Sequence, residues 1–305
     1  MRCLSVIIFL MLCLPSYLAY GQSGLMAPPA FDAASAYQLL QKQCRFGPRV
    51  PGTKAHQECG EFLFSYLHNL SSSTGKQPFT VDSANNPIEM LNIIASFDLM
   101  RQSRILLCAH WDSRPRADKE NDPARRKEPI SGANDGASGV AVLLEMARLI
   151  SNNPPESGVT IALFDGEDWG EEDRLDDYFL GSKYFAARLK PPLPDYAILL
   201  DMIGDKNLEI YMEQNSYAAN PSLVEAIWSR AASLGLKAFV PEVKYQVWDD
   251  HLPLIRAGIP SVDIIDLDYP YWHTLGDSPD KCSPESLKQV GDLLVSILYD
   301  PLKTY

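Results

Sequence analysis

Short, strongly apolar runs alternate along the chain with longer segments of mixed polarity. The apolar runs predict strands at Gln77–Val81, Met90–Ser96, Ile105–Ala109, Val159–Phe164, Tyr196–Ile203, Leu208–Met212 and Ile259–Ile265. The mixed segments predict helices at Ala33–Cys44, Gln57–Leu70, Val140–Ser151, Ser182–Leu189, Ser222–Gly235, His251–Ala257 and Ser283–Tyr299. The run at 159–164 is almost continuously apolar, which is typical of a strand covered on both faces of its sheet.

This alternation of strands and helices predicts one domain. We expect a single-domain α/β sandwich, with a largely parallel central mixed sheet flanked by helices. The chain has 305 residues, of which 46% are hydrophobic, and this is enough for one large core. Two polar stretches, Arg114–Pro129 and Gly170–Tyr178, are too long to be simple turns, so we expect them to be loops that carry function.

The first residues have the pattern of an export signal. Arg2 gives a positive start, Leu4–Leu14 is apolar but short for a membrane span, and Ala19–Gly21 resembles a cleavage site. An uncleaved anchor or a buried N-terminal helix is the alternative. We divide the chain into a signal peptide (1–21), a flexible lead (22–31) and a catalytic domain (32–305). We expect an exported protein, periplasmic, secreted or held at a membrane, with no stable membrane span after signal removal.

Charge and cysteine content narrow the possible partners. The net charge of −12 argues against nucleic acid, because phosphate binding needs clustered Lys and Arg. Cys44, Cys59, Cys108 and Cys282 follow the signal and lack the CxxC spacing of a structural zinc cluster. They could form disulfides in an exported chain, but the sequence does not pair them. The oligomeric state is also left open, with a monomer as the expectation.

Residues with metal-ligand chemistry follow the predicted strands repeatedly. The segments that carry them are His110–Asp112, Asn134–Gly136, Asp165–Asp168, Asp201 and Trp272–Thr274. In an open α/β sheet, ligands bind outside the carboxyl ends of the strands, so these segments can converge on one site. His and Asp side chains suit zinc, and a Glu beside a ligand is placed to act as general base.

Each of these residues also has an ordinary structural explanation. His110 could be a hydrogen-bonded core histidine, Asp135 a turn residue and Glu167–Asp168 a solvated pair. The conjunction of the segments, rather than any one of them, therefore carries the functional signal. His56 and His68 lie in polar, helical surroundings, and we expect both at the surface.

The ordered motifs resemble the zinc-dependent aminopeptidases of the M28 type. The motifs are His110-x-Asp112, Asn134-Asp135-Gly136-Ala137-Ser138-Gly139, Asp165-Gly166-Glu167-Asp168, Leu200-Asp201-Met202-Ile203-Gly204 and His273. The resemblance extends over about Phe31–Tyr299, nearly the whole of the expected mature chain. It implies a zinc aminopeptidase-like fold.

Further segments are similar to glutaminyl cyclases, both the animal enzymes and their bacterial relatives. They are Arg45–Gly52, Leu180–Lys183, Trp248–His251 and Trp272–Thr274. This similarity implies a glutaminyl-peptide cyclotransferase, which converts N-terminal glutamine of peptides and exported proteins to pyroglutamate and releases ammonia. It implies one zinc ion per chain held by Asp135, Asp168 and His273, with Glu167 as proton shuttle, Asp201 and Asp249 as hydrogen-bonded helpers, and Trp272 bordering the substrate pocket. Trp169 is a further candidate for the pocket wall.

Three positions depart from the animal pattern. Asp168 stands where animal cyclases carry Glu, and Asp263 stands where they carry His. Val140 occupies the place of the cysteine that would pair near Cys108. These departures leave the expected chemistry intact and indicate the bacterial type.

Two other functions remain open. In a two-zinc aminopeptidase, His110 and Asp201 would complete a second metal site, Asp135 would bridge the two ions, and Glu167 would activate water. The ligand types do not discriminate, but the cyclase-like segments at Trp248–His251 and Trp272 favour the cyclase. A non-catalytic binding domain is expected to lack a ligand or Glu167, and neither is missing.

Overall fold

The computed structural model describes residues 28–83, 86–171 and 174–302. The expected signal peptide and most of the expected lead lie outside these residues. Within the described part of the chain, no helix combines the length and apolar character needed to cross a membrane.

The central sheet has six strands in the order β1-β2-β4-β3-β5-β8. Their bounds are β1 Ser73–Ser83, β2 Asn86–Phe97, β3 Arg104–His110, β4 Gly158–Phe164, β5 Tyr196–Asp201 and β8 Ser261–Ile265. The pairs β1/β2 and β2/β4 are antiparallel, whereas β4/β3, β3/β5 and β5/β8 are parallel. The prediction of a largely parallel mixed sheet is therefore confirmed.

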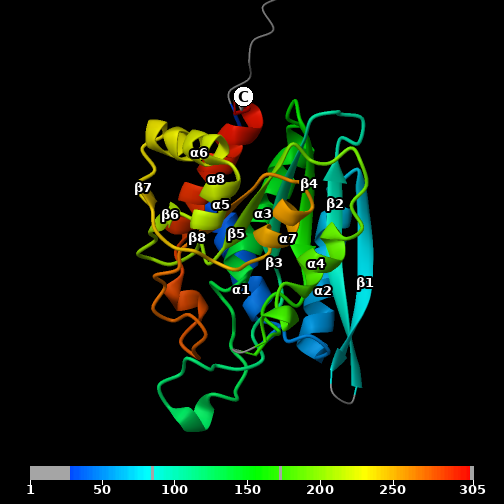
Figure 1. Cartoon of the computed structure of the whole chain (residues 1–305), viewed down its shortest axis with the longest axis vertical. Coiled ribbons are helices and arrows are strands. Elements are labelled where there is room, and N and C mark those ends of the chain that lie inside the picture. Colours follow the sequence, from blue (N-terminus) through cyan, green and yellow to red (C-terminus); the bar gives the residue numbers. More distant parts are fainter. Residues whose placement is uncertain (1–27, 84–85, 172–173, 303–305) are drawn as a thin grey trace, which may run out of the picture.

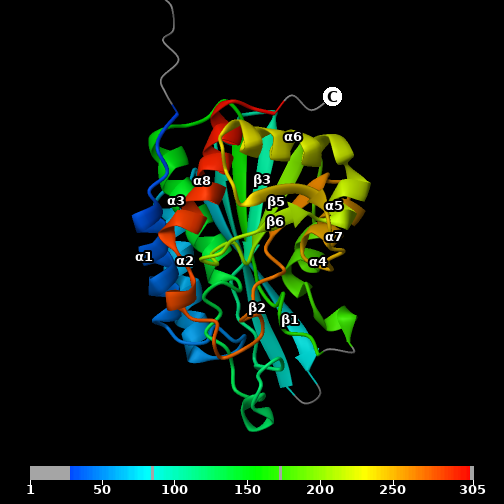
Figure 2. The ribbon, with the colours of Figure 1, turned by 90° about the vertical axis from the view of Figure 1, so that its left-hand side faces the viewer.

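Helices cover both faces of this sheet (Figures 1 and 2). On one face lie α1 Ala33–Cys44, α2 Lys54–His68, α3 Ala137–Asn152 and α8 Pro284–Tyr299. On the other lie α4 Leu180–Ala186, α5 Gln214–Ala219 and α7 His251–Arg256. A two-stranded parallel ribbon, β6 Ile210–Met212 and β7 Phe239–Val243, packs with α6 Pro221–Ser233 beside β8 and α8. Short 3₁₀ turns lie at Pro123–Arg125, Leu175–Asp177 and Pro279–Lys281.

The alternation of side chains along a strand divides the core into two layers. In β3, Ile105 and Leu107 belong to the large core beneath α1, α2, α3 and α8, whereas Leu106 and Cys108 belong to a smaller core beneath α4 and α7. All seven residues of β4 are buried, as predicted for a strand covered on both faces. The buried sheet is thus a rigid support for the loops at its carboxyl end.

The structure corrects the expectation for one of two helical histidines. His56 is not a surface residue: it is 4% exposed, its Nε2 lies 2.9 Å from Asp165 Oδ2, and its ring stacks on Trp111. These partners are distant in the sequence, which is why the local pattern around His56 did not reveal its burial. His68 is exposed, as expected. The four cysteines of the described residues are all free thiols.

Candidate active site

The parallel strands β3, β4 and β5 place their carboxyl ends at one edge of the sheet. His110 ends β3, Asp165–Asp168 follows β4, and Asp201 ends β5. The loop before α3 adds Asp135, and the segment after β8 adds His273. The structure therefore brings together the residues that the sequence placed after separate strands.

Asp135, Asp168 and His273 form a buried group that could hold a metal ion. His273 Nε2 lies 3.3 Å from Asp168 Oδ1 and 3.7 Å from Asp135 Oδ2. Within the described structure, Asp135 Oδ2 and Asp168 Oδ2 are buried without a hydrogen-bond partner. Burial of an unpaired carboxylate oxygen costs free energy, and a bound cation would remove that cost. Two carboxylates and one imidazole are ligands that suit zinc. The residues present thus fit a zinc ion.

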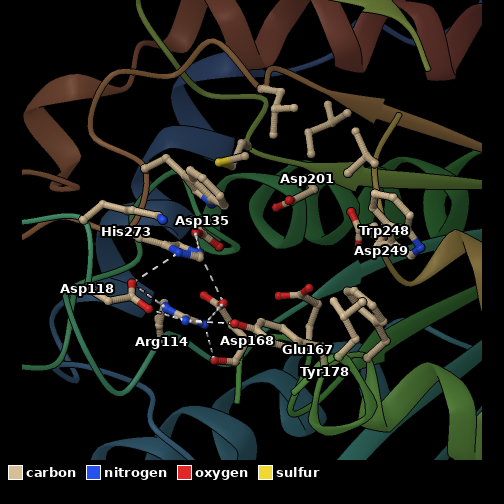
Figure 3. Close-up of a pocket in the computed structure, with 18 residues that line it drawn as sticks. Arg114, Asp118, Asp135, Glu167, Asp168, Tyr178, Asp201, Trp248, Asp249 and His273 are labelled. Carbon is tan, nitrogen blue, oxygen red and sulfur yellow. Dashed lines mark hydrogen bonds and ion pairs between the residues drawn. The ribbon is translucent and has the colours of Figure 1, made fainter. Parts of the chain in front are cut away.

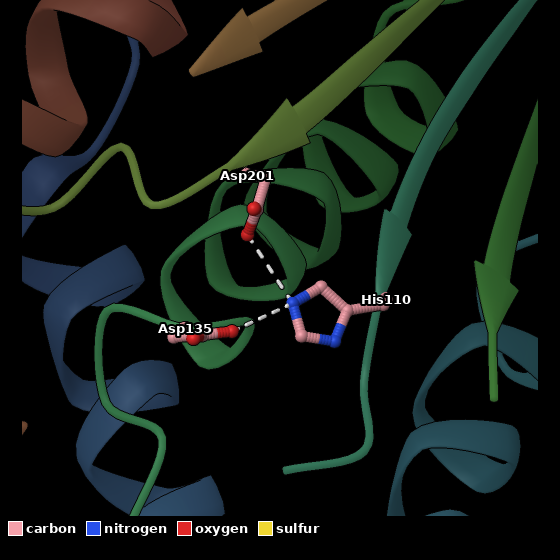
Figure 4. Close-up of side chains that lie close together, drawn as sticks. All are labelled: His110, Asp135 and Asp201. Carbon is pink, nitrogen blue, oxygen red and sulfur yellow. Dashed lines mark hydrogen bonds and ion pairs between the residues drawn. The ribbon is translucent and has the colours of Figure 1, made fainter. Parts of the chain in front are cut away.

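A second group of possible ligands shares one of these residues. His110 Nε2 lies 3.1 Å from Asp135 Oδ1 and 3.2 Å from Asp201 Oδ1 (Figure 4). Burial alone would lower the pKa of His110, but hydrogen bonds to Asp112, Asp135 and Asp201 raise it well above its ordinary value. The geometry accommodates either a proton on His110 or a second metal ion between these side chains.

Two buried carboxylates fix the backbone of the ligand-bearing loops. Asp112 accepts hydrogen bonds from the backbone N–H groups of Glu167–Asp168, at 3.2 and 3.3 Å. Asp277 accepts from the N–H groups of Asn134–Asp135, at 2.8 and 3.2 Å. Gly136 is required beside them, because an added Cβ would lie 2.4 Å from His110 Nε2.

Arg114 links two of the possible metal ligands, Asp168 directly and His273 through Asp118 (Figure 3). Its Nη1 donates to Asp168 Oδ1 at 2.8 Å, and its Nε donates to Asp118 Oδ1 at 3.0 Å. The same Asp118 oxygen lies 3.4 Å from His273 Nδ1. Burial would raise the pKa of Asp168, but His273 and Arg114 hold it well below its ordinary value. Such contacts orient metal ligands and keep them ionised.

These side chains line a pocket of about 230 Å³. Its polar part includes Asp135, Glu167, Asp168, Asp201, Asp249 and His273. Figure 3 shows the carboxylates of Glu167, Asp201 and Asp249 pointing into the same space. Burial and the Asp168 charge raise the pKa of Glu167 well above its usual range, and burial and the Asp201 charge do the same for Asp249. A carboxyl group with a raised pKa is suited to taking up and returning a proton.

The apolar part of the pocket differs from the sequence-based expectation. Trp272 lines the pocket, with its ring centroid 4.1 Å from that of His273. Trp169 is not among the lining residues, whereas Trp248 is, and 51% of it is exposed. No individual role was predicted for Trp248, Arg114 or Asp118. Trp248 belongs to the cyclase-like segment Trp248–His251, and Arg114 and Asp118 lie in the long polar loop that was expected to carry function.

Comparisons with known proteins identify the family and the fold. Residues 92–298 match peptidase family M28. The solved structure of a Zn-dependent exopeptidase from Parabacteroides distasonis is 39% identical with a TM-score of 0.87, covering 90% of this chain and 100% of that one. A Bacteroides thetaiotaomicron glutaminyl cyclase bound to N-acetylhistamine is 36% identical with a TM-score of 0.86, covering 89% of this chain and 99% of that one.

A mammalian relative extends the similarity. The glutaminyl-peptide cyclotransferase-like protein of Bos taurus is 26% identical, over 83% of this chain and 72% of the relative. The M28 match spans more than half of the chain and includes the residues from Asp135 to His273 that line the pocket. This protein therefore belongs to peptidase family M28.

Proposed function

We propose that this protein is a zinc-dependent glutaminyl cyclase, which converts N-terminal glutamine of peptides and proteins to pyroglutamate and releases ammonia. The observation that carries the proposal is the pairing, in one pocket, of the possible zinc ligands with the buried carboxyl group of Asp249 and the largely buried carboxyl group of Glu167. The similarity to solved bacterial glutaminyl cyclases over nearly their whole length supports it.

In the reaction, the α-amine of glutamine attacks the γ-carboxamide carbon of the same residue. A carbon–nitrogen bond forms, the bond to the amide nitrogen breaks, and ammonia leaves without consumption of water. A zinc ion held by Asp135, Asp168 and His273 would supply Lewis-acid stabilisation of the charge that develops on the γ-carbonyl oxygen. Because the attack is intramolecular, holding the two groups in contact is a large part of the catalysis.

Glu167 is the proton shuttle in this proposal. It takes a proton from the attacking amine and returns one to the departing nitrogen, a role suited to a largely buried carboxyl group of raised pKa. Asp249 and Asp201 accept hydrogen bonds from the substrate nitrogens, and Asp249 Oδ2 is buried without a partner among the described residues. Trp272 walls the pocket and excludes water, which would otherwise hydrolyse the amide.

The substrates we propose are peptides and exported proteins that begin with glutamine. The predicted export places the enzyme in the periplasm, outside the cell or at a membrane, where signal cleavage exposes new N-termini. We propose a monomer with one zinc ion per chain. The signal at 1–21 lies outside the described residues and stays a prediction.

A two-zinc aminopeptidase is the second candidate function. The group formed by His110, Asp135 and Asp201 favours it, because Asp135 could bridge two ions. The metal content of the purified protein distinguishes the two functions: we expect one zinc ion per chain, and two would favour the aminopeptidase.

The reaction product tests the proposal itself. We expect a peptide with N-terminal glutamine to keep all its residues, to lose the mass of one ammonia molecule and to become resistant to Edman degradation. Release of the whole glutamine residue, read by mass spectrometry, would contradict the cyclase and support the aminopeptidase.

A further inference from the structure

Two large apolar side chains stand exposed at the mouth of the pocket. Trp248 is 51% exposed and Leu175 is 55% exposed, and both line the pocket. They come from different parts of the chain, since Leu175 lies in the Gly170–Tyr178 loop and Trp248 lies three residues before the start of α7 at His251. Exposed apolar surface at a pocket mouth marks a place where a ligand can be covered.

The pocket wall next to Trp248 is also apolar. Met202, Val247 and Ile265 form a buried cluster that reaches the pocket wall. Because Val247 is the neighbour of Trp248, this wall continues directly from the buried cluster to the exposed indole. A ligand group that binds here therefore meets aromatic and aliphatic carbon rather than charge.

The place of Trp248 in the pocket determines which part of a bound peptide it would contact. Figure 3 shows Trp248 and Asp249 on the side of the pocket opposite His273. In the proposed function, the glutamine side chain extends toward the possible zinc ligands. We place its α-amine between Glu167, which takes the proton, and Asp249, whose Oδ2 is buried without a partner among the described residues. The α-carbonyl is attached to the same carbon atom as the amine, so the peptide chain leaves the pocket beside Asp249. The second residue then lies against Trp248.

We propose that Trp248 and Leu175 form a subsite for the side chain of the substrate's second residue, and that this subsite selects aromatic or large aliphatic side chains. The proposal rests on the proposed function, because it uses the orientation of the glutamine. An aromatic side chain can stack on the indole of Trp248, and a branched aliphatic one can be covered by Leu175. Glycine at the second position makes neither contact.

The test uses two peptides that differ only at the second position, one beginning Gln-Phe and the other Gln-Gly. We measure kcat/KM for ammonia release by the wild type, Trp248→Ala, Trp248→Phe and the control Leu234→Ala. Leu234 is an exposed leucine at the end of α6 that does not line the pocket. If neither peptide is turned over, isothermal titration calorimetry of the same peptides gives their affinities.

We expect the wild type to prefer Gln-Phe by roughly tenfold, the scale of one partly buried apolar side chain. Trp248→Ala should remove most of this preference by raising KM for the Gln-Phe peptide. Trp248→Phe should keep much of the preference, and Leu234→Ala should keep all of it. An unchanged ratio in Trp248→Ala, or an equal fall for both peptides, would overturn the subsite while the cyclase stands.

The proposed function can fail separately. If the wild type releases no ammonia from either peptide, the cyclase is wrong. The subsite is then judged on the calorimetric affinities, where the same preference and the same loss in Trp248→Ala are expected. Equal affinities of the wild type for the two peptides would overturn it.

Discussion

At the scale of single residues, the pocket is distinguished by carboxylate oxygens that are buried and lack a partner. In the described part of the chain, this holds for Oδ2 of Asp135, Asp168 and Asp249. Most buried polar groups in proteins are hydrogen-bonded, so atoms of this kind are where a metal ion or a substrate is expected. Glu167 adds a carboxyl group next to Asp168 that is not a member of either possible metal group around it.

The role of Glu167 can be tested by an isosteric change. Glu167→Gln should keep the fold and the zinc content but lower turnover by about a hundredfold or more, because the amide cannot carry the proton. The measurement is kcat for ammonia release alongside zinc per chain. Activity above about one tenth of wild type, a change of only ~1.4 kcal/mol in the barrier, would remove Glu167 from the shuttle role.

The proposed metal ligands can be distinguished from their neighbours in the same way. Asp135→Ala, Asp168→Ala and His273→Ala should each sharply reduce the zinc that remains after dialysis, since each removes one of the three proposed ligands. His110→Ala should reduce it far less if one ion is bound. Atomic emission spectroscopy measures zinc per chain in each variant. Equal losses of zinc in all four variants would favour the two-zinc site.

At the scale of elements, strand ends bring the residues together and loops give them their orientation. The strands β3, β4 and β5 deliver His110, Glu167–Asp168 and Asp201 to one edge. The final geometry depends on the loop at Arg114–Pro129, whose buried Arg114 contacts both Asp168 and Asp118. Loops fixed in this way can position ligands with the precision that a metal site needs.

The contribution of Arg114 can be measured through metal affinity. Arg114→Lys keeps the charge but loses the planar group that reaches Asp168 and Asp118 together, so we expect zinc affinity to fall by roughly tenfold. Competition with a chelator gives this affinity. The matched control is Arg125→Lys, an exposed arginine on the same loop that pairs with Glu128. Equal affinities in the two variants would show that Arg114 has no positioning role.

The sequence predicted some of these elements and not others. The apolar patterns predicted β3 and β4 because these strands are almost wholly buried, and α8 because its buried side chains recur at helical spacing. They missed α5 and β7, which are short and depend on other parts of the chain: α5 begins where the Glu213 side chain accepts from Asn215 and Ser216, and β7 pairs with β6. The burial of His56 and the place of Trp248 in the pocket wall were not predicted for a similar reason. Burial against the distant Asp165 and exposure at a pocket mouth leave no local periodicity in the sequence.

At the scale of the whole molecule, the chemistry is concentrated at one end of the sheet. Figure 2 shows the described N-terminal residues and the end of α8 at the opposite end of the molecule from the loop at Arg114–Pro129. A peptide can therefore approach the pocket without passing the described chain ends. The acidic pocket, with Glu167, Asp201 and Asp249, suits a substrate that presents a cationic N-terminus.

The most direct test of the central claim compares two peptides that differ only in their first residue, glutamine or leucine. Ammonia and free amino acid are measured in the same reactions, with Glu167→Gln as the inactive control. The cyclase predicts ammonia from the glutamine peptide and little or no free leucine from the other. Robust release of leucine, without ammonia from the glutamine peptide, would contradict the account.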